Sequence, residues 1–151
     1  MQAQILAPAA LLVVWTIIVM FAIIPARFGA IAKVADKSTL PRKVGVRGND
    51  LEGVIPDKAN WPAHNHTHLH EQPTLFYAVA VILAITGPGA LDVALAWGYL
   101  ALRVLHSLWQ IFVNTIPVRF ALFCASALVL LTLAIRAVMA TAFADPSALP
   151  A

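Results

Sequence analysis

Residues 1–26 contain no charged side chain, and this run constrains the fold of the chain more than any other feature. It is long enough to cross ~30 Å of hydrocarbon as a tilted helix. No basic residue precedes Arg27, and the run is longer than the apolar region of a signal peptide. We therefore interpret it as a retained membrane anchor.

The composition of the whole chain agrees with a membrane protein. Hydrophobic residues make up 61% and charged residues 11%, whereas a soluble domain usually has about 25% charged residues. Four spans of ~20 residues would use more than half of the chain, so we treat residues 1–151 as a single membrane domain. The net charge of +3 comes without a basic cluster interleaved with aromatics, which argues against nucleic-acid binding.

Charged residues and turn signals divide the chain into four apolar segments separated by polar ones. Gly87, Pro88 and Gly89 predict one turn, Asp92 suits the start of the next helix, and Pro117 predicts a second break. The expected class is an all-α integral membrane bundle of four transmembrane helices. We expect the helices at about 4–28, 70–87, 91–114 and 118–141, with a polar loop at about 29–65.

The distribution of positive charge predicts the orientation of the bundle. Seven of the ten Lys and Arg residues lie between Arg27 and Lys58, so the positive-inside rule places this loop in the cytoplasm. Both termini and the turn at 87–91 would then face the opposite side, and the turn near Pro117 would face the cytoplasm.

Polar residues in the third segment recur at helical spacing. Arg103, His106, Gln110 and Asn114 fall within a narrow stripe of one helix face. An arginine near mid-span costs at least ~2.5 kcal/mol on insertion scales, so it requires a partner and is a candidate for function. Glu71 is the best acidic partner in the sequence, and a purely structural Glu71–Arg103 ion pair is the alternative explanation.

The stripe is followed by Arg119 at the start of the fourth segment, which suggests a polar cavity that opens to the cytoplasm between helices. Guanidinium groups bind carboxylates in a bidentate manner, so such a cavity suits a small anionic ligand. A thiol near Arg119 would have a lowered pKa and a larger thiolate fraction.

Alternating histidines and a single cysteine are the remaining candidates for chemistry. The histidines are His64, His66, His68 and His70. Residues two apart do not share a helix face and no cysteine is nearby, so we expect no metal site and assign the histidines to polar contacts at the membrane rim. Cys124 lies in an apolar run and is expected to be a packing residue.

The segment RVLHSLWQIFVNTIPVRFALF, residues 103–123, resembles the third-to-fourth helix signature of the membrane-associated proteins in eicosanoid and glutathione metabolism, the MAPEG family. In that signature an Arg is followed by His three residues later, and Pro-x-Arg follows the turn; Arg103, His106, Pro117 and Arg119 match it. The segment NHTHLHEQPTLFYA resembles the second-helix motif of bacterial members. Its matching residues are Asn65, Glu71, Pro73 and Phe76, and His68 replaces the usual Asn.

The resemblance implies a homotrimer that binds glutathione between neighbouring protomers near the cytoplasmic face. Arg119 would stabilise the glutathione thiolate, which attacks a hydrophobic electrophile from the bilayer. The glutathione-binding set would comprise Asn65, His68, Glu71, Arg103, His106 and Gln110, with Arg103 paired to Glu71. Arg27 is the nearest counterpart of a first-helix arginine that some members use. The implied location is a bacterial inner membrane.

Two departures and two alternatives accompany this resemblance. Gln110 and Phe120 stand where some eicosanoid enzymes have tyrosine and serine, which argues against prostaglandin or leukotriene synthesis. The leading hypothesis is a glutathione-dependent transferase or peroxidase, and a non-catalytic ligand-binding scaffold of the same fold is the alternative. A transporter is disfavoured because the polar stripe does not continue to the far side. The sequence leaves the electrophile open.

Overall fold

The computed structural model describes residues 2–143 and contains four long helices joined by one extended loop and two short turns. The helices are α1 (Gln2–Ala32), α2 (Asp57–Thr86), α3 (Ala90–Phe112) and α4 (Ile116–Ala142). The loop between α1 and α2 contains two short 3-10 turns, η1 (Lys37–Thr39) and η2 (Gly48–Leu51). Residues 2–143 form no strand, so the predicted all-α class is confirmed.

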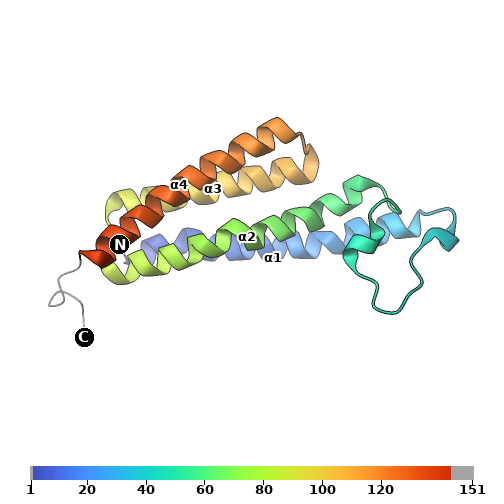
Figure 1. Ribbon diagram of the computed structural model, residues 1–151, viewed down its shortest axis with the longest axis horizontal. Coiled ribbons are helices and arrows are strands. Elements are labelled where there is room, and N and C mark those ends of the chain that lie inside the picture. Colours follow the sequence, from blue (N-terminus) through green and yellow to red (C-terminus); the bar gives the residue numbers. More distant parts are fainter. Residues whose placement is uncertain (1, 144–151) are drawn as a thin grey trace.

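All four helices are long and apolar enough to cross a membrane. Figure 1 shows α1 beside α2, and α3 beside α4, with the long loop at one end of the bundle. The α3–α4 turn lies toward this loop end, whereas the start of α1, the α2–α3 turn and the end of α4 lie at the opposite end. We call these the loop end and the far end.

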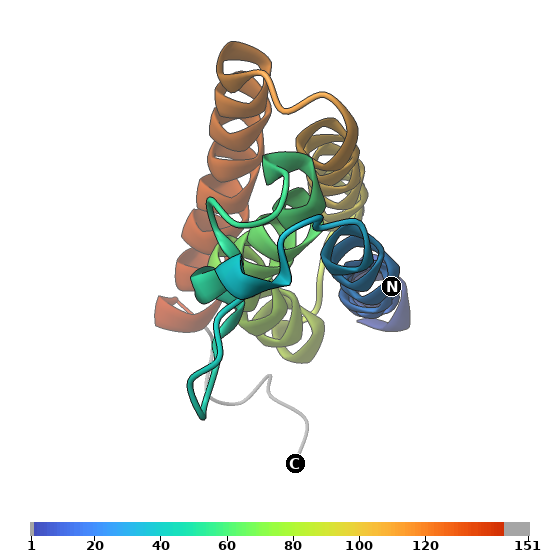
Figure 2. The same ribbon diagram turned by 90° about the vertical axis from the view of Figure 1, so that its right-hand side faces the viewer.

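Helix α2 occupies the centre of the bundle and packs against the other three helices (Figure 2). The outer helices α1 and α4 expose most of their large apolar side chains; Phe21, Ile24, Leu128 and Val138 are all more than half exposed. Helices α2 and α3 bury a larger share of their residues and carry most of the buried polar groups. This division suits a bundle in which lipid covers α1 and α4 and protein covers the polar groups.

Helix α2 begins earlier than the sequence predicts. We expected the second helix to start near residue 70, but α2 starts at Asp57, within the predicted loop. Pro56 precedes the first turn and Asp57 provides the acidic side chain that favours a helix N-terminus. Asn60, which is 1% exposed, accepts a hydrogen bond from Arg27 Nε at 3.2 Å. Packing against α1 therefore supports a helical segment that has no apolar run of its own.

The α3–α4 turn also differs in detail from the prediction. Helix α3 ends at Phe112, so Asn114 lies in the turn rather than in the polar stripe of the helix. Asn114 has φ +58°, a left-handed conformation that Asn tolerates better than most residues. Pro117 lies in the first turn of α4, where its missing N–H costs nothing, and starts the helix.

Candidate functional site

A pocket of about 220 Å³ lies at the loop end between α2, α3 and α4. It is lined by His68, His106, Ile116, Arg119, Phe120 and Phe123. Three of these residues belong to the predicted site, and each comes from a different helix. The polar part of the lining consists of two imidazoles and one guanidinium, and no carboxylate lines the pocket. The pocket therefore suits an anionic group with an apolar neighbour.

Arg119 supplies the cation of this pocket from the first turn of α4. Its Nη1 donates a hydrogen bond to Asn114 Oδ1 at 2.6 Å, and the left-handed backbone of Asn114 brings that amide back toward the helix start. Within residues 2–143 Arg119 forms no ion pair. The turn thus orients the guanidinium without neutralising its charge.

The second helix contributes a histidine beside an acid at the rim of the pocket. His68 Nδ1 lies 2.8 Å from Glu71 Oε2, and the rings of His68 and His106 meet edge to face with centroids 6.1 Å apart. The Glu71 side chain is 56% exposed. Glu71 therefore contacts His68 at the surface, outside the set of residues that line the pocket.

The predicted Glu71–Arg103 ion pair is wrong. Arg103 is 1% exposed, and its guanidinium instead donates to the backbone oxygen of His68 at 2.8 Å and to Gln72 Oε1 at 3.3 Å. Adjacent residues on a helix point about 100° apart. Gln72 therefore faces the bundle interior, while Glu71 points toward the surface.

Gln72 was not identified from the sequence, although it connects three helices. Its Oε1 accepts hydrogen bonds from Arg103, from Tyr99 Oη at 3.4 Å and from Ser126 Oγ at 3.0 Å. A glutamine next to Pro73 in a polar stretch carries no periodic signal. Its position one residue after the predicted acid was the available clue.

A second buried network lies at the loop end, and it joins α1, α2 and α3. Asn65 Nδ2 donates to Gln110 Oε1 at 2.9 Å, and Asn65 Oδ1 accepts from Ser107 Oγ. Ser107 Oγ in turn accepts from Trp15 Nε1 at 2.9 Å. Asn65 and Gln110 are 0% and 1% exposed. These two predicted site residues are therefore linked to each other but do not line the pocket.

Two other arginines lie outside the pocket. Arg27 bonds to Asn60 and lies against Gly48 of the loop, so it joins α1, α2 and the loop. Arg136, near the end of α4, pairs with Asp92 at the start of α3, and Asp92 also accepts from the backbone N–H of Gly89 at 2.8 Å. The pairing of Arg136 with Asp92 was not identified from the sequence.

The histidine segment forms ordinary helix-surface contacts. The rings of His66 and His70 lie with centroids 4.4 Å apart, and His64 Nε2 lies 3.0 Å from Glu52 Oε1. No group of three His, Cys, Asp or Glu side chains able to hold a metal occurs between residues 2 and 143.

The fold and the pocket together define a multi-pass helical membrane protein with a cationic site at one end of its bundle. A sequence model of the MAPEG family matches residues 5–139. The chain therefore belongs to the MAPEG family, and this membership supports a membrane function related to glutathione in general terms. Neither the curated proteins nor the solved structures gave a match to the chain.

Proposed function

We propose that this protein is a glutathione-dependent transferase or peroxidase that acts on hydrophobic electrophiles. The observation that carries the proposal is the environment of Arg119, a guanidinium without an acidic partner within residues 2–143 that lines a pocket bordered by apolar side chains. Membership of the MAPEG family supports a membrane function related to glutathione in general, without specifying the reaction. Glutathione is the proposed co-substrate.

The chemistry follows from the charge of the pocket. A guanidinium close to the thiol of glutathione stabilises the thiolate and lowers the pKa of the thiol. The fraction of glutathione present as the nucleophilic thiolate at neutral pH therefore increases. In a conjugation, the sulfur forms a bond to the electrophilic carbon while the leaving group departs with its electron pair. The thiol proton passes to solvent. Phe120 and Phe123 provide an apolar wall on which a bilayer-soluble substrate can rest.

The predicted site residues divide into two groups under this proposal. Arg119, His68 and His106 would contact glutathione directly, with Glu71 at the rim. Asn65, Gln110 and Arg103 would support the pocket without contacting glutathione, because each is almost fully buried and already hydrogen-bonded. The buried group would hold α2 and α3 in the register that brings His68 and His106 together.

A homotrimer is part of the proposal because one subunit offers only part of a binding site. The pocket of about 220 Å³ is smaller than the ~300–1,000 Å³ of most small-molecule sites. Two of the residues that line it, Ile116 and Phe120, are 70% and 64% exposed. A neighbouring subunit that covers these side chains would deepen the pocket. Light scattering of the purified protein, corrected for detergent, would give the subunit number.

The proposed location is a bacterial inner membrane with the pocket on the cytoplasmic side. The loop end, which carries the positive loop, is also the end where the pocket lies. The positive-inside rule assigns such a loop to the cytoplasm, where reduced glutathione would reach the pocket. Single cysteines can be placed in the loop or in the turn at residues 87–89 and labelled in intact cells with a reagent that does not cross the membrane. The accessibility of each cysteine would test this orientation.

The experiment that tests the function is stopped-flow absorbance of thiolate formation after glutathione is mixed with the purified protein. Wild type should form thiolate, and Arg119→Ala should not. Conjugation of an aryl halide should fall about 10²–10³-fold in Arg119→Ala, the loss typical of removing one donor that stabilises a developing anion. Arg119→Lys keeps the charge but not the planar donor geometry, so it should be intermediate.

Three results separate the proposal from its alternative. Equal thiolate formation by wild type and Arg119→Ala would contradict the assigned role of Arg119. No glutathione binding by wild type would contradict the function as a whole. Glutathione binding without turnover of any aryl halide or hydroperoxide would favour the ligand-binding scaffold.

A further inference from the structure

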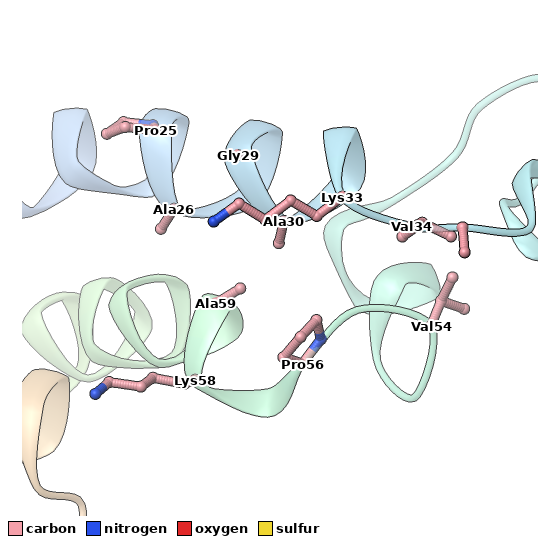
Figure 3. Close-up of a pocket in the computed structure, with 11 residues that line it drawn as sticks. Pro25, Ala26, Gly29, Ala30, Lys33, Val34, Val54, Pro56, Lys58 and Ala59 are labelled. Carbon is pink, nitrogen blue, oxygen red and sulfur yellow. The ribbon is translucent and has the colours of Figure 1, made fainter.

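A second and larger pocket lies outside the proposed glutathione site, between the end of α1 and the start of α2. Its volume is about 560 Å³, and Val54 of the loop closes one side (Figure 3). Most of its lining is small or apolar, including Pro25, Ala30 and Pro56. None of the residues that line it also lines the pocket of Arg119.

Two lysines provide the charge of this pocket. Lys33 comes from the residues that follow α1, and Lys58 comes from the first turn of α2. Both line the pocket; in Figure 3 Lys33 lies on the side of α1 that faces α2, whereas Lys58 lies on the side of α2 away from α1, and both ammonium groups point along the helices toward the membrane-spanning part. The lining includes no acidic residue, and within residues 2–143 neither lysine forms an ion pair. The pocket therefore presents uncompensated positive charge.

The depth of the pocket corresponds to the headgroup layer of a bilayer. Helix α1 has 31 residues, about 46 Å at 1.5 Å per residue, whereas the hydrocarbon core is only ~30 Å thick. Because the first charged residue of the chain is Arg27, the excess length lies at the end of α1, and its last turns emerge into the headgroup region. Trp61 lies at the same level, with Lys58 Nζ 5.9 Å from the ring centroid, and tryptophan is enriched at membrane interfaces.

We propose that this pocket binds the phosphate group of an anionic phospholipid. Lys33 would contact the phosphate between the two helices, the exposed Lys58 side chain would reach it from the edge of the pocket, and the apolar lining would hold the glycerol and the first carbons of the acyl chains. A free phosphate ion shares the first of these interactions. The apolar lining and the depth favour the lipid. The proposal does not depend on glutathione binding.

The test measures how many phosphatidylglycerol molecules the full-length protein retains, and how tightly, by native mass spectrometry from detergent micelles. Lys33→Gln/Lys58→Gln should bind phosphatidylglycerol about 25-fold more weakly, because one lysine near an anionic headgroup is worth roughly fivefold. Arg42→Gln/Arg47→Gln is the matched control: it removes the same number of positive charges from the loop outside the pocket, and neither side chain forms an ion pair within residues 2–143. The control should stay within twofold of wild type.

A second pair of variants tests the shape of the pocket with all charges retained. Ala30 points into the space between α1 and α2 in Figure 3, so Ala30→Leu should reduce phosphatidylglycerol retention. Ala32→Leu, outside the lining, should not. Melting temperatures of the variants would confirm that each is folded.

Four results would overturn the proposal. Equal losses in the two double variants would show general attraction to the basic loop. Equal retention by Ala30→Leu and wild type would place the lipid elsewhere. Equal binding of phosphatidylcholine would remove the anionic preference. Displacement of the bound lipid by millimolar inorganic phosphate would assign the site to a soluble anion.

Discussion

At the far end of the bundle, Arg136 and Asp92 neutralise each other across α4 and α3, whereas at the loop end Arg119 has an amide as its partner and no carboxylate within residues 2–143. Both arginines are oriented by hydrogen bonds near a helix end. Asp92 also caps the first turn of α3, because it accepts a hydrogen bond from the backbone N–H of Gly89. The far-end pair has the features of a structural clamp.

The loop end uses a different solution for its buried polar groups. Arg103, Asn65 and Gln110 form hydrogen bonds with neutral oxygens and amides rather than with acids. Among residues 2–143, only Nε of Arg103 is a buried side-chain nitrogen or oxygen without a hydrogen-bond partner. The buried hydrogen bonds therefore hold the helices together without placing an acidic side chain beside Arg119. The difference between the two arginines is that Arg136 has an acidic partner, whereas Arg119 lines a pocket and has none within residues 2–143, and the proposed function rests on this difference.

The largest expected effect on stability is at the far end. Asp92→Ala removes both the pair with Arg136 and the cap on Gly89, and we expect the free energy of unfolding to fall by about 2 kcal/mol. Asp92→Asn keeps a capping oxygen and should lose about half as much. Reversible unfolding in SDS would measure both. Loss of glutathione binding by either variant while it remains folded would break the separation between the two ends.

A smaller effect is expected at the buried network of the loop end. Asn65→Ala removes two hydrogen bonds inside the bundle, each worth ~0.6 kcal/mol in membrane proteins, so stability should fall by about 1 kcal/mol. Glutathione affinity should fall less than threefold, because Asn65 is fully buried and does not line the pocket. A loss above tenfold at unchanged stability would instead indicate direct contact with glutathione.

The smallest effect is expected where the network reaches α1. Trp15→Phe removes the indole donor to Ser107 and should cost about 0.6 kcal/mol. Trp97→Phe is the control, since Trp97 is 44% exposed and should change stability little. If the two variants lose the same amount of stability, the bond from Trp15 to Ser107 contributes nothing specific.

The number and order of the helices could be predicted because each apolar run is long and ends at charges or at Gly and Pro. The start of α2 could not, because residues 57–69 are polar and become helical through packing against α1. The same limit explains the wrong partner for Arg103. Glu71 and Gln72 are adjacent in sequence, and only the rotation of α2 about its axis decides which one faces Arg103.

The candidate site was predictable in its chemistry rather than in its contacts. Helical spacing correctly placed Arg103, His106 and Gln110 on the buried face of α3. Spacing alone could not show that only His106 of these three lines the pocket. The Asp92–Arg136 pair could have been predicted from the sequence, because antiparallel α3 and α4 bring the start of one helix beside the end of the other.

The most direct test of the contrast between the two arginines is calorimetric titration of glutathione into the purified wild type, Arg119→Ala and Arg136→Ala. The loss of hydrogen bonds from a charged group predicts about 10–100-fold weaker binding for Arg119→Ala. Arg136→Ala should bind glutathione as wild type does, although it is less stable. Equal affinities in all three proteins, or equal losses in both variants, would contradict the assignment of a ligand site to the loop end and a structural clamp to the far end.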